Sequence, residues 1–225
     1  MRGIILAAGL GTRMRPLTDS LPKPLLKVGG KALIEYHIEN LVRAGITDIV
    51  INHFYLGATL EAALGDGSDY GANIQYSRET ERLETAGGII KAMPMLGDES
   101  FAVISGDVFT DYDYRNLRPV DGFEAKARLV MVANPNHHQN GDFALLQDGR
   151  LRLAEASSQG LTYSGISVMH PALFTGLDEA PLALRPVLDE AIALDQIAAE
   201  KFTGRWFDIG TPERLAELEG LLLAD

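Results

Sequence analysis

Short apolar runs alternate with amphipathic helical stretches through the first half of the chain. Residues 3–8 are continuously apolar and end at a glycine, which is typical of a strand buried on both faces. Further strands are predicted at residues 48–52, 74–77 and 101–105, with helices at 32–44, 56–64 and 86–93. Such alternation with short links is typical of a parallel sheet that helices cover on both faces. We therefore predict an α/β fold with a doubly wound core.

The second half of the chain departs from this alternation. Residues 143–153 alternate around an Asp-Gly turn, which predicts a β-hairpin inserted into the α/β core. We expect further strands at residues 128–132, 163–169 and 205–208, a helix at 185–194, and a last helix that begins at Pro212 with Thr211 as its N-cap. No internal repeat or linker is visible in the sequence, so we predict one domain over residues 1–225.

Composition limits the ligands that such a chain can bind. It has 20 basic and 31 acidic residues, which gives a net charge of −11. This balance argues against a broad surface for nucleic acid or for anionic membranes, because such surfaces need many lysines and arginines. An anionic ligand is therefore expected to bind locally. The absence of cysteine excludes disulfides and thiolate chemistry, and the N-terminus shows no export signal, so we expect a cytoplasmic protein.

A glycine-rich segment directly after the first strand is the densest functional signal. Gly9 and Gly11 would let backbone N–H groups approach a phosphate closely, and Arg13 follows them at once. The segment matches neither the Walker pattern nor the dinucleotide pattern, because Met14 stands where the latter needs its third glycine. Two interpretations stay open for this segment alone: an anion-binding loop with a cation, or a tight turn that carries an arginine.

Three further charged residues stand at constrained positions. Lys23 lies between two prolines, which fix the backbone; it is either a point charge for a triphosphate or a solvated loop lysine. Asp107 and Asp208 each follow a predicted strand, where ligands bind in open α/β sheets. A shared Mg²⁺ is the economical interpretation, since this ion prefers carboxylate and phosphate oxygens. For Asp107, an Asx turn or a helix cap is the alternative.

Four motifs together resemble those of the sugar-1-phosphate nucleotidyltransferase family. They are Leu-Ala-Ala-Gly-x-Gly-Thr-Arg-Met-x-Pro-Leu-Thr, Pro-Lys-Pro, Gly-Asp after a buried strand, and Trp-x-Asp-Ile-Gly-Thr near the end. The resemblance spans nearly the whole chain. It implies a Rossmann-like, mostly parallel sheet and an enzyme that makes nucleotide-sugars from a nucleoside triphosphate and a sugar 1-phosphate.

The resemblance also implies roles for particular residues. Arg13 and Lys23 would be the catalytic cations, and Asp107 and Asp208 would hold Mg²⁺. The nucleotide would be bound by Ala8, Gly9, Gly11, Thr12, Arg13, Lys23, Glu81 and Thr85. The sugar would be bound by Gly106, Asp142, Glu155 and Gly165. Many relatives have a lysine after the residue that corresponds to Glu155, whereas this chain has alanine. We expect Trp206 in the core and His137 and His138 in a loop on the sugar side.

Local departures from the family pattern indicate which member is nearest. Glu84 stands where mannose-1-phosphate guanylyltransferases have glycine, which argues against guanine. Residues 134–143 and 162–167 resemble the short uridylyltransferases of cell-wall recycling, so UTP is the expected donor. The alternatives are a guanylyltransferase, a glucose-1-phosphate or phosphocholine transferase, and, from another class, an inert domain that senses nucleotide-sugars. A nicotinamide oxidoreductase is disfavoured by the missing third glycine. The oligomeric state stays open.

Overall fold

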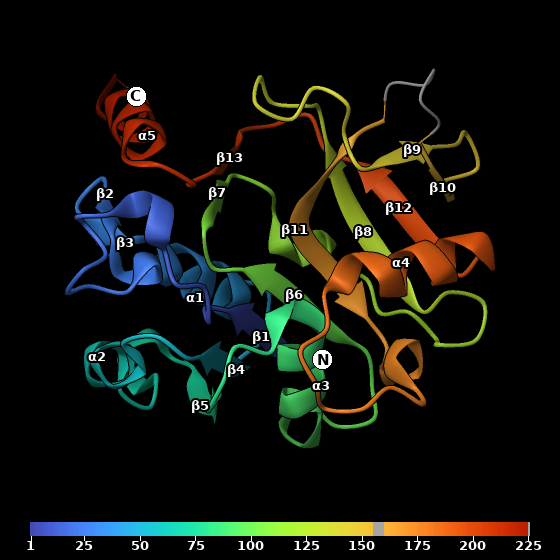
Figure 1. Ribbon diagram of the computed structural model, residues 1–225, viewed down its shortest axis with the longest axis horizontal. Coiled ribbons are helices and arrows are strands. Elements are labelled where there is room, and N and C mark those ends of the chain that lie inside the picture. The colour runs from blue at the N-terminus through green and yellow to red at the C-terminus, as the bar shows by residue number, and fades with distance from the viewer. Residues whose placement is uncertain (155–159, 225) are drawn as a thin grey trace.

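A seven-stranded sheet runs through the middle of the protein, as the computed structural model shows (Figure 1). The structure describes residues 1–154 and 160–224. In spatial order the strands are β12 (Ile197–Lys201), β8 (Ala127–Val132), β11 (Thr162–Met169), β6 (Phe101–Ser105), β1 (Gly3–Leu6), β4 (Asp48–His53) and β5 (Asn73–Arg78). β1 pairs in parallel with β4 and β6, β4 with β5, and β12 with β8, whereas β11 runs antiparallel to both its neighbours. The predicted mostly parallel sheet is therefore confirmed.

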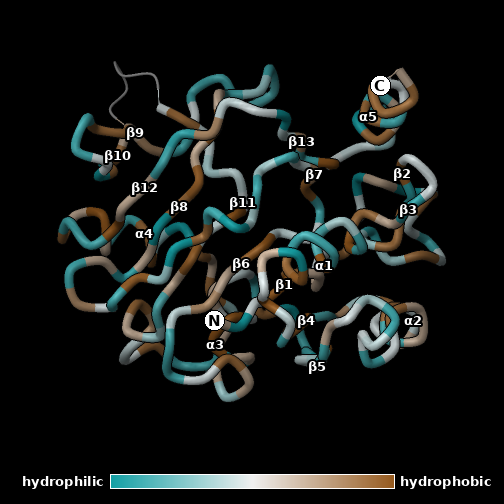
Figure 2. The backbone as a smooth tube through the Cα atoms, turned by 180° about the vertical axis from the view of Figure 1, so that it is seen from behind, coloured by the Kyte–Doolittle hydropathy of each residue, from teal (hydrophilic) through white to brown (hydrophobic). Residues whose placement is uncertain are grey.

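Helices cover both faces of this sheet, because successive strand residues point to opposite sides. Ile4 packs in the core under α3 (Glu84–Leu96) and α4 (Leu184–Ala193). Its neighbour Ile5 packs in the core under α1 (Leu33–Arg43) and α2 (Gly57–Leu64). Figure 2 shows hydrophobic residues along β8, β6 and β1. The doubly wound α/β class is thus confirmed. Within the described ranges, no helix has the length and hydropathy that crossing a bilayer requires.

Among the described residues, three short antiparallel pairs lie outside the main sheet, and two of them involve the second half of the chain. β9 (Phe143–Leu145) pairs with β10 (Leu151–Leu153), which confirms the predicted hairpin. β7 (Val108–Thr110) pairs with β13 (Trp206–Asp208), so the predicted last strand does not join the main sheet as its position after the helix implied. β7 was not predicted, because only Gly106 and Asp107 separate it from the apolar run of β6. This second pair is the element that brings the end of the chain back to the sheet.

A third apolar cluster holds the glycine-rich segment in place. Met14 is fully buried there with Phe109 of β7, Ile209, and Leu218 of α5 (Pro212–Ala224). The same cluster includes Leu26, which precedes β2 (Lys27–Val28), and Val28, which belongs to it; β2 pairs with β3 (Lys31–Ala32). Met14, which stands where the dinucleotide pattern needs glycine, therefore anchors the loop that carries Arg13. Short 3₁₀ helices lie at Thr12–Met14, Lys23–Leu25, Ser68–Tyr70, Tyr114–Asn116 and Pro171–Phe174.

Candidate active site

Two cavities meet at the carboxyl ends of β1 and β6. The first has a volume of about 450 Å³ and the second about 560 Å³. Thr85, Ser105 and Asp107 line both cavities and so form the boundary between them. This is the edge of an open α/β sheet at which ligands bind. Two ligands that occupied the two cavities would therefore meet beside Asp107.

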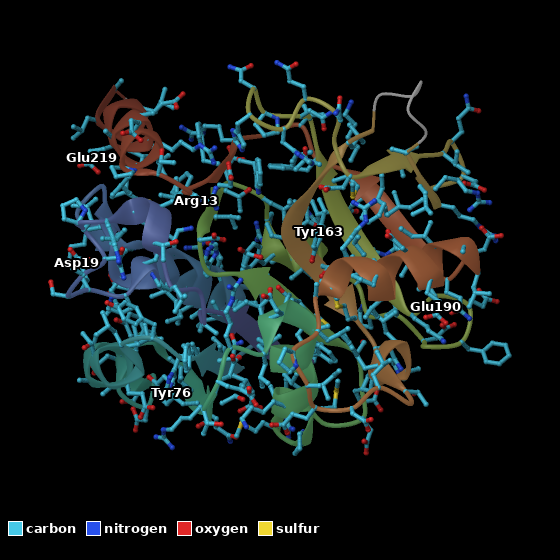
Figure 3. All side chains as sticks on the ribbon, viewed as in Figure 1. Arg13, Asp19, Tyr76, Tyr163, Glu190 and Glu219 are labelled. Atoms are coloured by element: carbon cyan, nitrogen blue, oxygen red, sulfur yellow. The ribbon has the colours of Figure 1, made fainter. Side chains whose placement is uncertain are left out.

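The glycine-rich segment forms one wall of the first cavity. Ala8, Gly9, Gly11, Thr12 and Arg13 all line it. Gly11 has φ +62°, and a Cβ there would lie 3.0 Å from Cγ2 of Thr18, so both backbone and packing require glycine. The Thr18 hydroxyl donates to the Gly11 carbonyl at 2.7 Å and closes the loop. Arg13 is exposed beside β7 (Figure 3) and has no carboxylate partner among the residues that the structure describes.

A buried pair of polar side chains forms the floor of the same cavity. Oδ1 of Asn52 accepts from the Ala7 N–H at 3.0 Å, and its Nδ2 donates to Oε1 of Glu79 at 2.7 Å. Burial raises the pKa of the Glu79 carboxyl. Sequence reasoning placed a nucleotide contact at Glu81, which is exposed and does not line the cavity, whereas Glu79 and Thr85 do. Glu79 was missed because its partner Asn52 comes from a different strand.

Lys23 and Asp107 form an ion pair at the boundary between the cavities. Nζ of Lys23 lies 2.6 Å from Oδ2 of Asp107. The lysine side chain is only 10% exposed, because the Pro22–Pro24 segment and its 3₁₀ turn bury the stem, whereas the Asp107 side chain is 44% exposed. The ammonium is thus held at a fixed place that borders the first cavity. The carboxylate keeps solvent access and has Oδ1 free of any hydrogen bond from a described residue.

The pairing of β7 with β13 brings Asp208 next to Asp107. Asp208 stands opposite Val108, and the N–H of Ile209 donates to the Asp107 carbonyl at 2.8 Å. Both carboxylate oxygens of Asp208 have partners: Nε2 of His137 lies 3.0 Å from Oδ1, and Nη1 of Arg214 lies 2.6 Å from Oδ2. Two carboxylates that are distant in the sequence thus lie at the same end of the antiparallel β7–β13 pair, which we call the β7–β13 ribbon. The sequence predicted a strand at 205–208 and a shared site for the two carboxylates; the strand is present, but it pairs with β7 and not with the main sheet.

The buried side chain of His37 is hydrogen-bonded to β7. Nε2 of His37 lies 2.8 Å from the Val108 carbonyl, so it is the donor, and Nδ1 accepts from the Tyr114 hydroxyl at 2.8 Å. Burial lowers the pKa of His37 to about 4, against a weaker raising effect of the Val108 hydrogen bond and of Asp107. His37 is therefore neutral at pH 7. It positions β7 and hence Asp107 without touching either cavity.

We expect His37 to make stability depend on pH. The unfolded chain binds a proton at His37 below pH 6.5, whereas the folded chain resists it until about pH 4, so stability is full above 6.5 and falls below it. The loss by pH 4 is on the order of 3 kcal/mol. Urea unfolding at pH 7 and pH 4.5 measures it. His37→Gln, which cannot titrate, should lose correspondingly less over that range; equal losses in both proteins would contradict the assignment.

Polar and aromatic residues together line the second cavity. Asp142 lines it, with Oδ2 accepting from the Tyr163 N–H at 2.8 Å and Oδ1 lying 3.1 Å from Nε2 of His138. Gly165 also lines it; its φ is +78° and a Cβ would lie 2.5 Å from Oγ of Ser105. Trp206, expected in the core, instead borders this cavity, because its Nε1–H donates to the Ser164 carbonyl at 2.8 Å.

The other two predicted sugar contacts are Gly106 and Glu155. Gly106 lines the first cavity and not the second. Glu155 lies outside the described residues.

Arg185 lines the second cavity but was not predicted from the sequence. A helical arginine four residues before Asp189 is typical of a surface ion pair. Glu84, which lines the first cavity, has φ +60°, a conformation in which glycine is favoured.

Comparisons with known proteins identify relatives of this chain by sequence and by fold. The family model described as nucleotidyl transferase matches residues 2–150. The chain is 47% identical to the N-acetylmuramate alpha-1-phosphate uridylyltransferase of Neisseria meningitidis serogroup B over 98% of each chain. It is 32% identical to the mannose-1-phosphate guanyltransferase of Gibberella zeae over 95% of this chain and 62% of that one. A Bacillus anthracis protein assigned as a glucose-1-phosphate thymidylyltransferase, solved with sucrose, has the same fold, with a TM-score of 0.86, 22% identity and coverage of 99% and 95%.

Proposed function

The chain belongs to the nucleotidyl transferase family and is a sugar-1-phosphate nucleotidyltransferase, and we propose that it joins UTP to N-acetylmuramate α-1-phosphate. The products are UDP-N-acetylmuramate and pyrophosphate. We base the choice of UTP and of N-acetylmuramate on sequence identity: the chain is 47% identical to an N-acetylmuramate alpha-1-phosphate uridylyltransferase and 32% identical to a mannose-1-phosphate guanyltransferase. We further propose that the reaction serves cell-wall recycling in the cytoplasm.

The two cavities support a direct displacement. A phosphate oxygen of the sugar 1-phosphate attacks the α-phosphorus of UTP, a new P–O bond forms, and the bond to the β-phosphate breaks as pyrophosphate leaves. No general base is needed, because a phosphate monoester has its second pKa near ~6 and is already largely dianionic at pH 7. The barrier is the repulsion between two anions, which positioning and positive charge must overcome.

The proposed roles follow from where the cations lie. Backbone N–H groups of the Gly9–Gly11 loop would bind the triphosphate, and Arg13 would fork across oxygens of the leaving pyrophosphate. Lys23, at the boundary of the cavities, would contact oxygens of both reacting phosphates. The buried Asn52–Glu79 pair would hold the floor of the nucleotide cavity rigid.

Mg²⁺ is the metal we propose for Asp107 and Asp208. Within residues 1–154 and 160–224, no group of three or more metal-binding side chains is placed to hold an ion, so the protein would supply two carboxylates. That donor set fits Mg²⁺, which commonly combines one or two carboxylates with water and substrate phosphates. When bound, the ion would neutralise charge on the phosphates. Asp107 and Asp208 would hold it, and the partners of Asp208 would fix the direction of that carboxylate.

A substrate matrix tests the proposal. Pyrophosphate release is measured for four nucleoside triphosphates against the 1-phosphates of N-acetylmuramate, N-acetylglucosamine, mannose and glucose, with Mg²⁺ and with excess EDTA. We expect the highest rate with UTP and N-acetylmuramate 1-phosphate, and loss of that rate in EDTA with recovery when Mg²⁺ is restored. A higher rate with GTP and mannose 1-phosphate would overturn the assignment. Nucleotide-sugar binding without turnover in any pair would favour the sensing alternative.

A further inference from the structure

Arg185 is the one arginine or lysine among the described residues that line the second cavity. It lies in the first turn of α4, where two contacts fix its guanidinium. Nε donates to Oδ1 of Asp189 at 2.6 Å, and Cζ lies 4.5 Å from the centre of the Phe143 ring. Such stacking orients the plane of a guanidinium and leaves its outer edge available. The arginine is thus pre-organised although its side chain is 49% exposed.

The guanidinium of Arg185 has N–H groups that donate to no described residue. The other nearby carboxylate is Asp142, and Nη1 of Arg185 lies 3.7 Å from its Oδ1, beyond hydrogen-bond distance. The Asp142 oxygens instead face His138 and the Tyr163 N–H. The two Nη groups therefore have no hydrogen-bond acceptor among the described residues. A fixed guanidinium with free donors in a cavity matches a planar carboxylate, which it can bind through two parallel hydrogen bonds.

We propose that Arg185 binds the carboxylate of the lactyl ether of N-acetylmuramate and thereby selects this sugar. The proposal rests on the proposed function, which names that sugar. N-acetylmuramate differs from N-acetylglucosamine by an ether-linked lactic acid, so the two sugars differ in charge by one carboxylate. A neutral sugar requires no permanent cation, since hydroxyls are bound by groups such as Asp142. Arg185 is accordingly a specificity-determining residue.

The position of Arg185 separates this role from binding of the sugar phosphate. The phosphate must lie near the boundary of the cavities to reach the nucleotide, and that boundary is formed by Thr85, Ser105 and Asp107, with Lys23 paired to Asp107. Arg185 does not line the first cavity and does not belong to the boundary. If it bound the phosphate, its removal would weaken all sugar 1-phosphates equally. If it binds the lactyl carboxylate, its removal weakens one sugar alone.

The chain carries its own reporter for the test. Trp206 is the single tryptophan and lines the second cavity, so its fluorescence reports on ligands there. N-acetylmuramate 1-phosphate and N-acetylglucosamine 1-phosphate are titrated separately into the wild type, Arg185→Gln and Arg185→Lys. Arg115→Gln is the matched control, because Arg115 also pairs with a neighbouring aspartate, at 2.7 Å, but lines neither cavity. Melting temperatures check that each variant is folded, and pyrophosphate release with UTP is recorded in parallel.

We expect the wild type and the control to bind the carboxylate sugar more tightly than the neutral one by about 10- to 100-fold, the range for a charge-assisted bidentate contact. Arg185→Gln should lose this preference and keep its affinity for the neutral sugar, and Arg185→Lys should keep part of it. A preference that survives Arg185→Gln, an equal loss for both sugars, or no preference in the wild type overturns the inference. An Arg185-dependent preference without pyrophosphate release would instead uphold the inference and refute the proposed function.

Discussion

Replacement of Arg13 by glutamine should lower kcat for nucleotidyl transfer by roughly 10³-fold or more, as loss of one transition-state arginine does in phosphoryl transfer. The guanidinium lines the nucleotide cavity and has no carboxylate partner among the described residues, so its charge is available for the pyrophosphate. Because the charge on the leaving group grows during the reaction, the loss should appear in kcat more than in KM. Steady-state kinetics of pyrophosphate release measures both.

Arg15 supplies the matched control for this experiment. It lies two residues further along, is 58% exposed, and pairs with Asp19 at 3.3 Å outside both cavities. Arg15→Gln should therefore leave kcat within a few-fold of the wild type. Neither variant should change the melting temperature much, since exposed substitutions cost about 0.5 kcal/mol or less. Comparable kcat values for Arg13→Gln and Arg15→Gln would remove Arg13 from the mechanism.

The placement of Arg13 could be predicted from sequence because the cause is local. A buried strand followed by Gly9 and Gly11 puts the next residues at the carboxyl edge of the sheet, whatever the rest of the chain does. The alternation of apolar strands and helices likewise predicted the doubly wound sheet. Lys23 is a similar case, since its two prolines and the short distance to the glycine loop leave it few positions.

The missed residues depend on contacts between distant segments. Asp208 and its strand were predicted, but their pairing with β7 was not, because β7 follows the apolar run of β6 after only two residues. Glu79 is a functional candidate only because Asn52 lies beside it, and Arg185 only because Phe143 from the hairpin stacks on it. Trp206 was expected in the core because sequence cannot show that one side of its strand faces a cavity.

Replacement of Lys23 by methionine should lower kcat/KM by about 10²- to 10³-fold, the loss typical for one donor aimed at developing charge. Methionine fills the volume of the buried stem and removes only the ammonium. In this variant the Asp107 carboxylate loses its ion-pair partner. Because the Asp107 side chain is 44% exposed, water can solvate it, and the fold should persist. Lys27→Met is the control, because Lys27 is exposed and lines neither cavity. Equal activity of the two variants would exclude a catalytic role for Lys23.

A double variant then separates two ways in which Lys23 could act. If Lys23 only positions Asp107, then Lys23→Met combined with Asp107→Asn should be no slower than Asp107→Asn alone, since the function of the pair is already lost. If its ammonium contacts phosphate oxygens directly, the loss from Lys23→Met should persist at full size in the Asp107→Asn background. We expect the second result, because the buried stem of Lys23 holds Nζ at the border of the nucleotide cavity, where Asp107 is only one of its possible acceptors.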